Sequence, residues 1–202
     1  MNNFLAIDTS SRYLTVCAHG DKKSVVRHLP QCAMKHSVIL MEEVEKALNE
    51  AELSLCDCDF FSAVTGPGSF TGIRIGIAAA KGFAVATGKP LVSVTSFELI
   101  AYNVTDENFC AVIDAGRSHF YVCGFGPERQ VTLAPSYMSE NAVNALGLPL
   151  YGFEDLQLEN YRKIEVKDCL CGAVLSHKDR AGGDMRALYV RKSQAEEARG
   201  EA

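Results

Sequence analysis

The sequence predicts an α/β protein made of two lobes, of which the second is reduced in size. Within the first 104 residues, three short strand-like segments precede an alternation of helix, strand, helix, strand and helix. A second set of strand-like segments starts after residue 104 but soon becomes short and rich in loops. With 202 residues, the chain is long enough to bury a core in this arrangement.

The first three strands are expected to form an antiparallel meander. Asn3–Asp8 is an apolar run that ends in an acid, Tyr13–His19 alternates as a strand does, and Ser24–Leu29 is a third short strand. Short turns separate them, at residues 9–12 and 20–21. Connections this short predict that neighbouring strands run in opposite directions.

A helix is expected over His36–Glu50, because apolar residues from Val38 to Leu48 recur at helical spacing and form a wide stripe. The apolar run Phe60–Thr65 then predicts a buried strand. Leu91–Val94 is the fifth strand, and Ser96 is expected to cap a short helix that follows it, Phe97–Tyr102.

The second long helix is predicted over Phe70–Thr87, after a tight Gly/Pro turn and before Gly88. Gly72, Gly76 and Ala80 recur every four residues, so they share one helix face. Each interior glycine costs roughly 1 kcal/mol of helix stability relative to alanine. Close approach of another backbone is the expected gain, and that backbone belongs either to a partner or to this chain's own sheet.

The second lobe begins with three predicted strands, Phe109–Asp114, His119–Phe125 and Gln130–Leu133. Beyond them, Val143–Leu158 offers one helix end and one strand, Leu148–Tyr151, and Ala173–His177 is a further short helix. We therefore expect a first lobe over residues 1–104 and a reduced second lobe over residues 105–193. The small, polar residues 194–202 are expected to form a disordered tail.

Composition narrows the classes of function. The net charge is −5 and Lys and Arg are scattered, so any role with RNA is expected to depend on a partner. No apolar run reaches the roughly 18 residues that span a membrane, and the N-terminus has no signal-peptide pattern, so a cytoplasmic location is expected. The eight cysteines are then expected to be reduced. Two Cys-x-Cys pairs occur, but because structural zinc sites usually have a wider spacing, these cysteines are expected to be core or loop residues and not zinc ligands.

The run Gly66–Gly76, together with Asp8-Thr9-Ser10, resembles the TsaB family, the non-catalytic partner subunits of the bacterial tRNA threonylcarbamoyladenosine synthase. The resemblance is dense over residues 4–103. It implies an actin-like (ribonuclease H-like) fold of two lobes. It also implies a heterodimer with TsaD, in which the two long helices form a four-helix bundle between the subunits.

The resemblance implies further partners and a set of binding residues. The ATPase TsaE is expected to act with the complex, and tRNA is expected to be reached only through the complex. The apolar faces of the two long helices predict in addition that the chain forms a homodimer when it is alone. The alternative for the two helices is that they only cover their own sheet. The predicted partner-binding residues are His36, Leu40, Val44, Gly72, Ile73, Gly76 and Ala80.

Asp8, Thr9 and Ser10 resemble a degenerate nucleotide loop of the actin-like ATPases, which have a glycine where this chain has Ser10. The turn Gly66–Gly76 is no Walker A loop either, because the Gly-Lys-Ser/Thr triplet is missing. Residues 114–117 match a second phosphate loop only in part. No tightly bound cofactor is expected, and ATP or ADP is expected only at a partner boundary.

Catalysis and metal binding are not expected. The related TsaD carries two metal-binding histidines, and the matching positions here are Ser96 and Ile100, of which isoleucine cannot ligate. The alternatives are a metallopeptidase or a small-molecule kinase of the same superfamily. Near the end, Tyr189-Val190-Arg191 resembles a Tyr-x-Arg element that closes the chains of the TsaB family.

Overall fold

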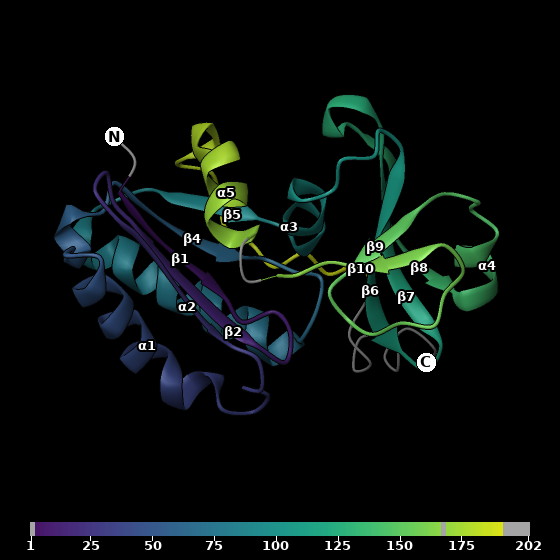
Figure 1. Cartoon of the computed structure of the whole chain (residues 1–202). Coiled ribbons are helices and arrows are strands. Elements are labelled where there is room, and N and C mark those ends of the chain that lie inside the picture. Colours follow the sequence, from purple (N-terminus) through teal and green to yellow (C-terminus); the bar gives the residue numbers. More distant parts are fainter. Residues whose placement is uncertain (1–2, 167–168, 192–202) are drawn as a thin grey trace, which may run out of the picture.

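The computed structural model describes residues 3–166 and 169–191, and in this part of the chain the strands form two five-stranded sheets. Each sheet is the centre of one lobe, and the two lobes lie side by side (Figure 1). The predicted α/β arrangement of two lobes is therefore confirmed. The predicted tail over residues 194–202 lies outside the described residues.

The first sheet has the strand order β3-β2-β1-β4-β5. Strands β1, β2 and β3 form the expected antiparallel meander, and β1, β4 and β5 run parallel to one another. Because parallel neighbours need crossover connections, the helices between these strands must lie over the sheet. The strands of this sheet are β1 (Phe4–Asp8), β2 (Leu14–His19), β3 (Ser24–Leu29), β4 (Phe60–Val64) and β5 (Leu91–Val94).

Helices α1 (His36–Glu50) and α2 (Phe70–Thr87) cover one face of the first sheet, and their bounds are those predicted (Figure 1). Alternate residues of β1, Leu5 and Ile7, are buried in the core under these two helices. Gly88 ends α2 in the left-handed conformation, with φ at 70°, as the sequence predicts. A short 3-10 helix, Leu55–Asp57, precedes β4.

The third helix, α3 (Ser96–Tyr102), begins one residue earlier than predicted, and the prediction that Ser96 caps it is wrong. Its cap is Thr95, whose Oγ1 accepts a hydrogen bond of 3.1 Å from the backbone N–H of Glu98. Glu98 Oε2 in turn accepts one of 2.8 Å from the backbone N–H of Thr95. This reciprocal capping box satisfies two donors that would otherwise lack partners.

The second sheet repeats the order of the first, as β8-β7-β6-β9-β10. Strands β6, β7 and β8 form an antiparallel meander, and β9 and β10 add to β6 in parallel. The reduction therefore affects the last two strands and the helices, while all five strand positions are kept. The sequence did not predict β10, and β8 is longer than expected. The elements are β6 (Phe109–Gly116), β7 (His119–Phe125), a 3-10 helix (Pro127–Arg129), β8 (Val131–Ser139), α4 (Glu140–Asn144), β9 (Leu150–Gly152) and β10 (Tyr161–Lys163).

Helix α5 (Cys169–Ser176) lies on the first lobe, although its sequence falls in the range expected for the second. It covers the face of the first sheet opposite α1 and α2 (Figure 1). Its buried residues Leu170 and Val174 share a core with Phe4 of β1 and with residues of β2, β4 and β5. A 3-10 helix, Lys178–Arg180, follows it.

Cys17 of β2 and Cys171 of α5 form a disulfide, with their Cα atoms 6.0 Å apart. The expectation that all eight cysteines are reduced is therefore corrected. Of the first Cys-x-Cys pair, Cys56 is exposed while Cys58 is buried, and in the described part of the chain no group of three or more potential metal ligands occurs.

Helix α3 and the final described segment connect the lobes. Phe97 and Ile100 of α3 pack with Phe109 of β6, and Leu188 and Val190 pack against the same core. The lobes thus share an apolar boundary. Within residues 3–166 and 169–191, no helix is long and apolar enough to cross a membrane.

Candidate functional site

The structure places the seven predicted partner-binding residues inside this chain. All of them are buried, and most belong to the core between the helices and the first sheet. They are therefore brought together, but as the inner face of the two helices. These residues are His36, Leu40 and Val44 of α1, and Gly72, Ile73, Gly76 and Ala80 of α2.

The small-residue face of α2 packs on the chain's own first strand and loop. A Cβ at Gly76 would lie 2.6 Å from Thr9 Oγ1 and 3.5 Å from Ile7 Cγ2. A Cβ at Gly72 would overlap the carbonyl oxygen of Thr9, and Thr9 Oγ1 donates a hydrogen bond of 2.7 Å to the carbonyl oxygen of Gly72. Of the two alternatives for this face, close packing on the chain's own backbone is the one observed. Binding of a partner by the two helices stays a prediction.

His36 holds the start of α1 against the loop after β1. Its ring is buried, and Nε2 lies 2.9 Å from the carbonyl oxygen of Tyr13, to which it donates. Because a carbonyl can only accept, Nε2 carries the proton in this contact. His36 is therefore a packing residue of the first lobe, and only its edge reaches the cavity described below.

The loop Asp8-Thr9-Ser10 is fully buried and bonded to itself and to the start of α2. Asp8 Oδ1 accepts hydrogen bonds from the backbone N–H and the hydroxyl of Ser10, at 2.9 and 2.6 Å. Burial raises the pKa of the Asp8 carboxyl, and the hydrogen bonds from Ser10 oppose this shift. The carbonyl of Ser10 accepts the backbone N–H of Ser69, the residue before α2, at 2.7 Å.

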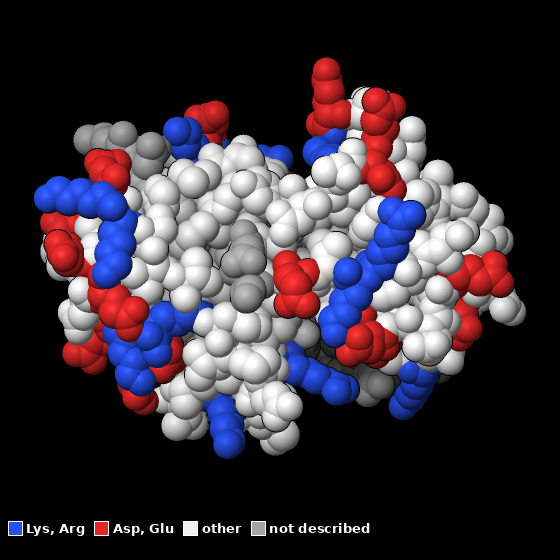
Figure 2. Space-filling model, in the orientation of Figure 1, with Lys and Arg blue, Asp and Glu red and all other residues white. Residues whose placement is uncertain are grey.

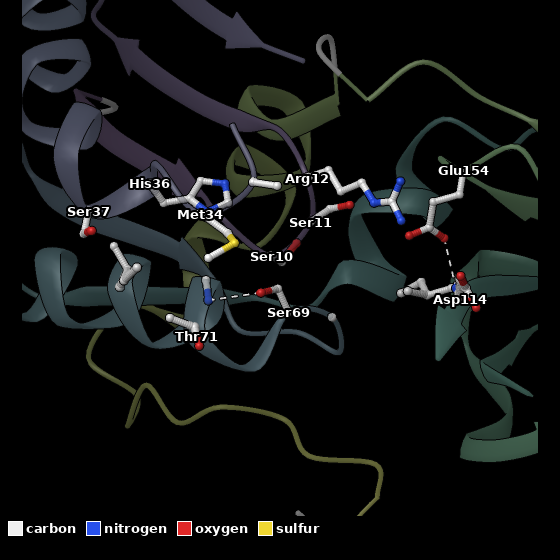
Figure 3. A pocket seen from close by; sticks show the side chains of 15 residues that line it. Ser10, Ser11, Arg12, Met34, His36, Ser37, Ser69, Thr71, Asp114 and Glu154 are labelled. Atoms are coloured by element: carbon white, nitrogen blue, oxygen red, sulfur yellow. Dashed lines mark hydrogen bonds between the residues drawn. The ribbon is translucent and has the colours of Figure 1, made fainter. Parts of the chain in front are cut away.

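A cavity of about 610 Å³ opens between the lobes beside this loop (Figure 3). Ser10, Ser11 and Arg12 come from the first lobe, and Asp114 and Glu154 face them from the second. The side chain of Arg12 points toward the carboxyl group of Glu154 (Figure 3). Burial raises the pKa of Glu154, which also accepts the backbone N–H of Asp114 at 2.9 Å.

This cavity does not fit the phosphate chain of a nucleotide. The N–H groups of Ser69 and Gly72 at the start of α2 already bond to the Ser10 carbonyl and to Ser69 Oγ. A Cβ at Gly68 would overlap the carbonyl of Ser10, so the chain's own backbone occupies the space that the glycine frees. The carboxyl groups of Asp114 and Glu154 line the second-lobe side of the cavity, where the cation of Arg12 is directed at Glu154 and not into free space.

Sequence reasoning did not single out Arg12 or Glu154. Arg12 is separated from the Asp8–Ser10 loop by one residue, so its closeness to the site could have been noticed. Glu154 lies in the segment after β9, which carries no local motif. Its place opposite Arg12 depends on how the lobes pack, and no short-range pattern encodes that.

Tyr189, noted in the sequence only for the Tyr-x-Arg resemblance, contacts the first turn of α2. Its hydroxyl accepts a hydrogen bond of 3.0 Å from Arg74 Nε, and its ring lies 5.3 Å from that of Phe70, centroid to centroid. The backbone N–H of Leu188 donates to the carbonyl of Thr65 at 2.8 Å. The end of the described chain is therefore tied to the turn that precedes α2.

Charges are mixed on the face of the molecule drawn in Figure 2. Lys and Arg lie next to Asp and Glu over much of its rim, and the middle of the first lobe carries few charges. This face therefore offers no continuous basic stripe of the kind that grips a nucleic acid backbone.

Comparisons with known proteins agree on one family. A family model described as "TsaD: tRNA N6-adenosine threonylcarbamoyltransferase" matches residues 28–159. The chain is 30% identical over 149 residues to the tRNA threonylcarbamoyladenosine biosynthesis protein TsaB of Escherichia coli (strain K12), which covers 67% of this chain and 64% of that protein. It is 32% identical over 119 residues to the protein of the same name from Bacillus subtilis (strain 168), which covers 58% and 52%.

The structure of YeaZ from Pseudomonas aeruginosa superposes with a TM-score of 0.77 over 94% of this chain and 100% of that chain, at 19% identity. This likeness supports the fold alone. The chain spans less than two thirds of the length of the TsaB relatives that it matches. The family model covers more than half of the chain, and those relatives carry one name. The chain therefore has the predicted actin-like fold and belongs to the TsaD family, and it is similar to TsaB proteins of that family.

Proposed function

We propose that the chain is a non-catalytic scaffold subunit that binds a TsaD-type protein and supports the formation of threonylcarbamoyladenosine in tRNA. The names of its relatives place those proteins in this biosynthesis. The proposal extends to a cytoplasmic location and to cooperation with the ATPase TsaE. It also includes a homodimer of the isolated chain.

The observation that carries the proposal is a set of exposed apolar side chains on the outer sides of α1 and α2. Val38 of α1 is 78% exposed and Val85 of α2 is 86% exposed. Met41 on α1 is exposed as well, and the outer positions Ala78 and Ala86 of α2 are apolar and uncharged. Two neighbouring helices that present large apolar side chains to water are suited to pack against two helices of another protein.

The loops support a role without catalysis. Ile100, at one of the positions where TsaD carries a metal-binding histidine, is fully buried in the core between the lobes. The carbonyl groups of Thr9 and Ser10 occupy the space beside Gly72 of α2 and Gly68 of the preceding turn, where a nucleotide loop would leave room for phosphate. A TsaD-type partner would therefore have to supply the catalytic groups.

Co-purification with the TsaD-type protein of the same organism tests the proposal. We expect the wild-type chain to retain the partner and Val38→Glu and Val85→Glu to lose it, because each change places a charge in a desolvated interface. The matched control is Val131→Glu, which alters an exposed valine on β8 of the second lobe and should pair normally. Normal pairing by all three variants, with unchanged thermal melts, would contradict the proposed surface.

A further inference from the structure

Six side chains form a strip across the boundary of the two lobes. Phe70 and Arg74 come from the first turns of α2, Tyr189 and Arg191 from the last described segment, and the remaining two from the second lobe. That segment is the yellow part of the chain that runs from one lobe to the other in Figure 1. We call the six the ring–arginine strip: Phe70, Arg74, Tyr189, Arg191, Tyr137 and His119.

In the first-lobe half of the strip, an arginine lies beside two exposed rings. The guanidinium carbon of Arg74 is 3.8 Å from the centroid of the Phe70 ring and 5.9 Å from that of Tyr189. Arg74 Nε donates a hydrogen bond of 3.0 Å to the Tyr189 hydroxyl. Both rings remain nearly half exposed. The arginine is thus held in place by aromatic contacts and not by an acid.

The second-lobe half repeats this arrangement with other residues. The guanidinium carbon of Arg191 is 4.8 Å from the centroid of Tyr137, and Arg191 Nη1 donates to the Tyr137 hydroxyl at 2.9 Å. His119 stacks on Tyr137 with centroids 4.8 Å apart and ring planes 10° from parallel. The arginine, the tyrosine and the histidine therefore form a second stack.

The final segment joins the two halves. Leu188 and Val190 pack against the core between the lobes, whereas the alternate residues Tyr189 and Arg191 are exposed. The chain bends at Val190 and Arg191, and Tyr189 contacts Arg74 of the first lobe while Arg191 contacts Tyr137 of the second.

We propose that the ring–arginine strip binds single-stranded RNA by base stacking. The inference rests on the proposed function, in which that RNA is an unpaired loop or end of the tRNA. Exposed rings beside an arginine, as Phe70 and Tyr189 are beside Arg74, are what unpaired bases stack on, and arginine also contacts phosphate. Among the described residues Arg74 has no acidic partner, so its other N–H donors remain available.

An acidic peptide fits the strip less well than RNA. It needs cations but gains little from flat ring faces, and the strip offers more ring surface than charge. The net charge of −5 predicts that the isolated chain binds RNA weakly, because long-range attraction is absent. In an assembly that already holds tRNA, the strip would act at a high effective concentration, so weak stacking suffices.

The chain contains no tryptophan, so a single introduced indole reports on one place. We would titrate Tyr189→Trp with a seven-nucleotide single-stranded oligoribonucleotide and follow the indole emission. The matched control is Tyr102→Trp on α3, because Tyr102 is 46% exposed and Tyr189 is 47% exposed. We expect quenching at tens of micromolar RNA in Tyr189→Trp and none in Tyr102→Trp. Equal quenching in the two variants overturns the proposal.

Two further titrations test whether Arg74 contributes to binding and whether the strip prefers RNA to other anions. In the Tyr189→Trp background, Arg74→Gln should weaken binding at least fivefold and make it less dependent on salt. Polyglutamate of matched length should not quench; if it quenches as well as RNA does, the strip is a general anion surface and the proposal fails. The co-purification experiment is independent, because Arg74→Gln should keep its partner. If the wild-type chain does not co-purify with the TsaD-type protein but RNA still quenches Tyr189→Trp, only the proposed function is overturned.

Discussion

Thr9 and Gly72 are locked together, because Thr9 Oγ1 donates to the carbonyl of Gly72 at 2.7 Å while the Thr9 carbonyl fills the space where a side chain would begin. The loop after β1 and the first turn of α2 therefore behave as one unit. The glycine keeps this loop closed on the helix. In a phosphate loop, a glycine at such a position would instead leave space for the bound phosphate.

Substitution of two helical glycines should have opposite effects on stability. Gly72→Ala should lower the free energy of unfolding by about 1–3 kcal/mol, because the new methyl group overlaps backbone that cannot move easily. Gly82→Ala on the exposed side of α2 meets nothing within 4 Å and should raise it by about 0.5–1 kcal/mol. Urea unfolding of both variants measures the difference. An unchanged free energy of unfolding in Gly72→Ala would show that the loop after β1 can move to accommodate the methyl group.

Gly76→Arg should unfold the chain. Gly76 faces Thr9 and Ile7 inside the first lobe, and because a Cβ there already lies 2.6 Å from Thr9 Oγ1, the longer arginine side chain overpacks the core between helix and sheet. We expect loss of the cooperative thermal transition followed by near-ultraviolet circular dichroism. A normal melt with lost partner binding would instead support a small-residue face that is open to a partner.

The isolated chain should form a homodimer at high micromolar concentration through the outer face of α1 and α2. A twofold arrangement would bury Val38 and Val85 in both copies. Sedimentation equilibrium should show the dimer for the wild type and a monomer for Val85→Glu. A wild type that stays monomeric would restrict this surface to contacts with another protein.

The cluster of Glu98, His177 and Arg180 should stabilise the protein most between about pH 4.5 and 6.5. Glu98 Oε1 lies 2.5 Å from Arg180 Nη1 and 3.4 Å from His177 Nε2. Despite an opposing effect of burial, hydrogen bonds from His177 and Arg180 lower the pKa of Glu98 from 4.5 to about 2. The hydrogen bond to Glu98 raises the pKa of His177 above 6.5.

The signs of the two shifts define this pH range. The contribution of Glu98 is complete above its unfolded pKa and is lost as the pH falls toward 2, up to about 3 kcal/mol. That of His177 is complete below 6.5 and is lost as the pH rises through its folded pKa. The difference in unfolding free energy between wild type and His177→Gln should therefore shrink above neutral pH. A difference that does not change between pH 5 and 9 would contradict the assignment.

Reduction of the Cys17–Cys171 disulfide should destabilise the protein by about 2–5 kcal/mol, because the bond closes a loop of 154 residues. A reductant should lower the melting temperature of the oxidised wild type. The variant Cys171→Ala should melt at that lower temperature with or without reductant. An equal effect of reductant on this variant would assign the shift to other thiols.

The sequence predicted the first lobe well because its signals are local. Periodicity defined α1 and α2, and the run after Pro90 predicted β5. The remaining features depend on contacts between distant residues, which local patterns do not encode. The glycine spacing in α2, for example, suits a partner helix as well as the chain's own β1. Strand β10 has only three residues, too few for a pattern. The Thr95 cap could have been found, since Glu98 three residues later completes the capping box.

The candidate site was predictable in part. The loop at Asp8 was found because it follows a strand and resembles a known motif. That this loop hydrogen-bonds to itself and to the start of α2 could not be predicted, because it depends on contacts between residues more than 60 positions apart, such as Thr9 and Gly72. The contact between Arg74 and Tyr189 spans 115 residues, so no window of sequence could reveal it.

Helix α5 makes the order of synthesis matter for this protein. When the ribosome has released the first 104 residues, the sheet face that carries Phe4 and Val92 still lacks its cover, because residues 169–176 have not been made. The nascent first lobe therefore exposes this apolar sheet face, at which it can associate with other chains, until most of the protein has emerged. Early termination would release a fragment that chaperones and proteases recognise, so the cell would quickly remove incomplete copies.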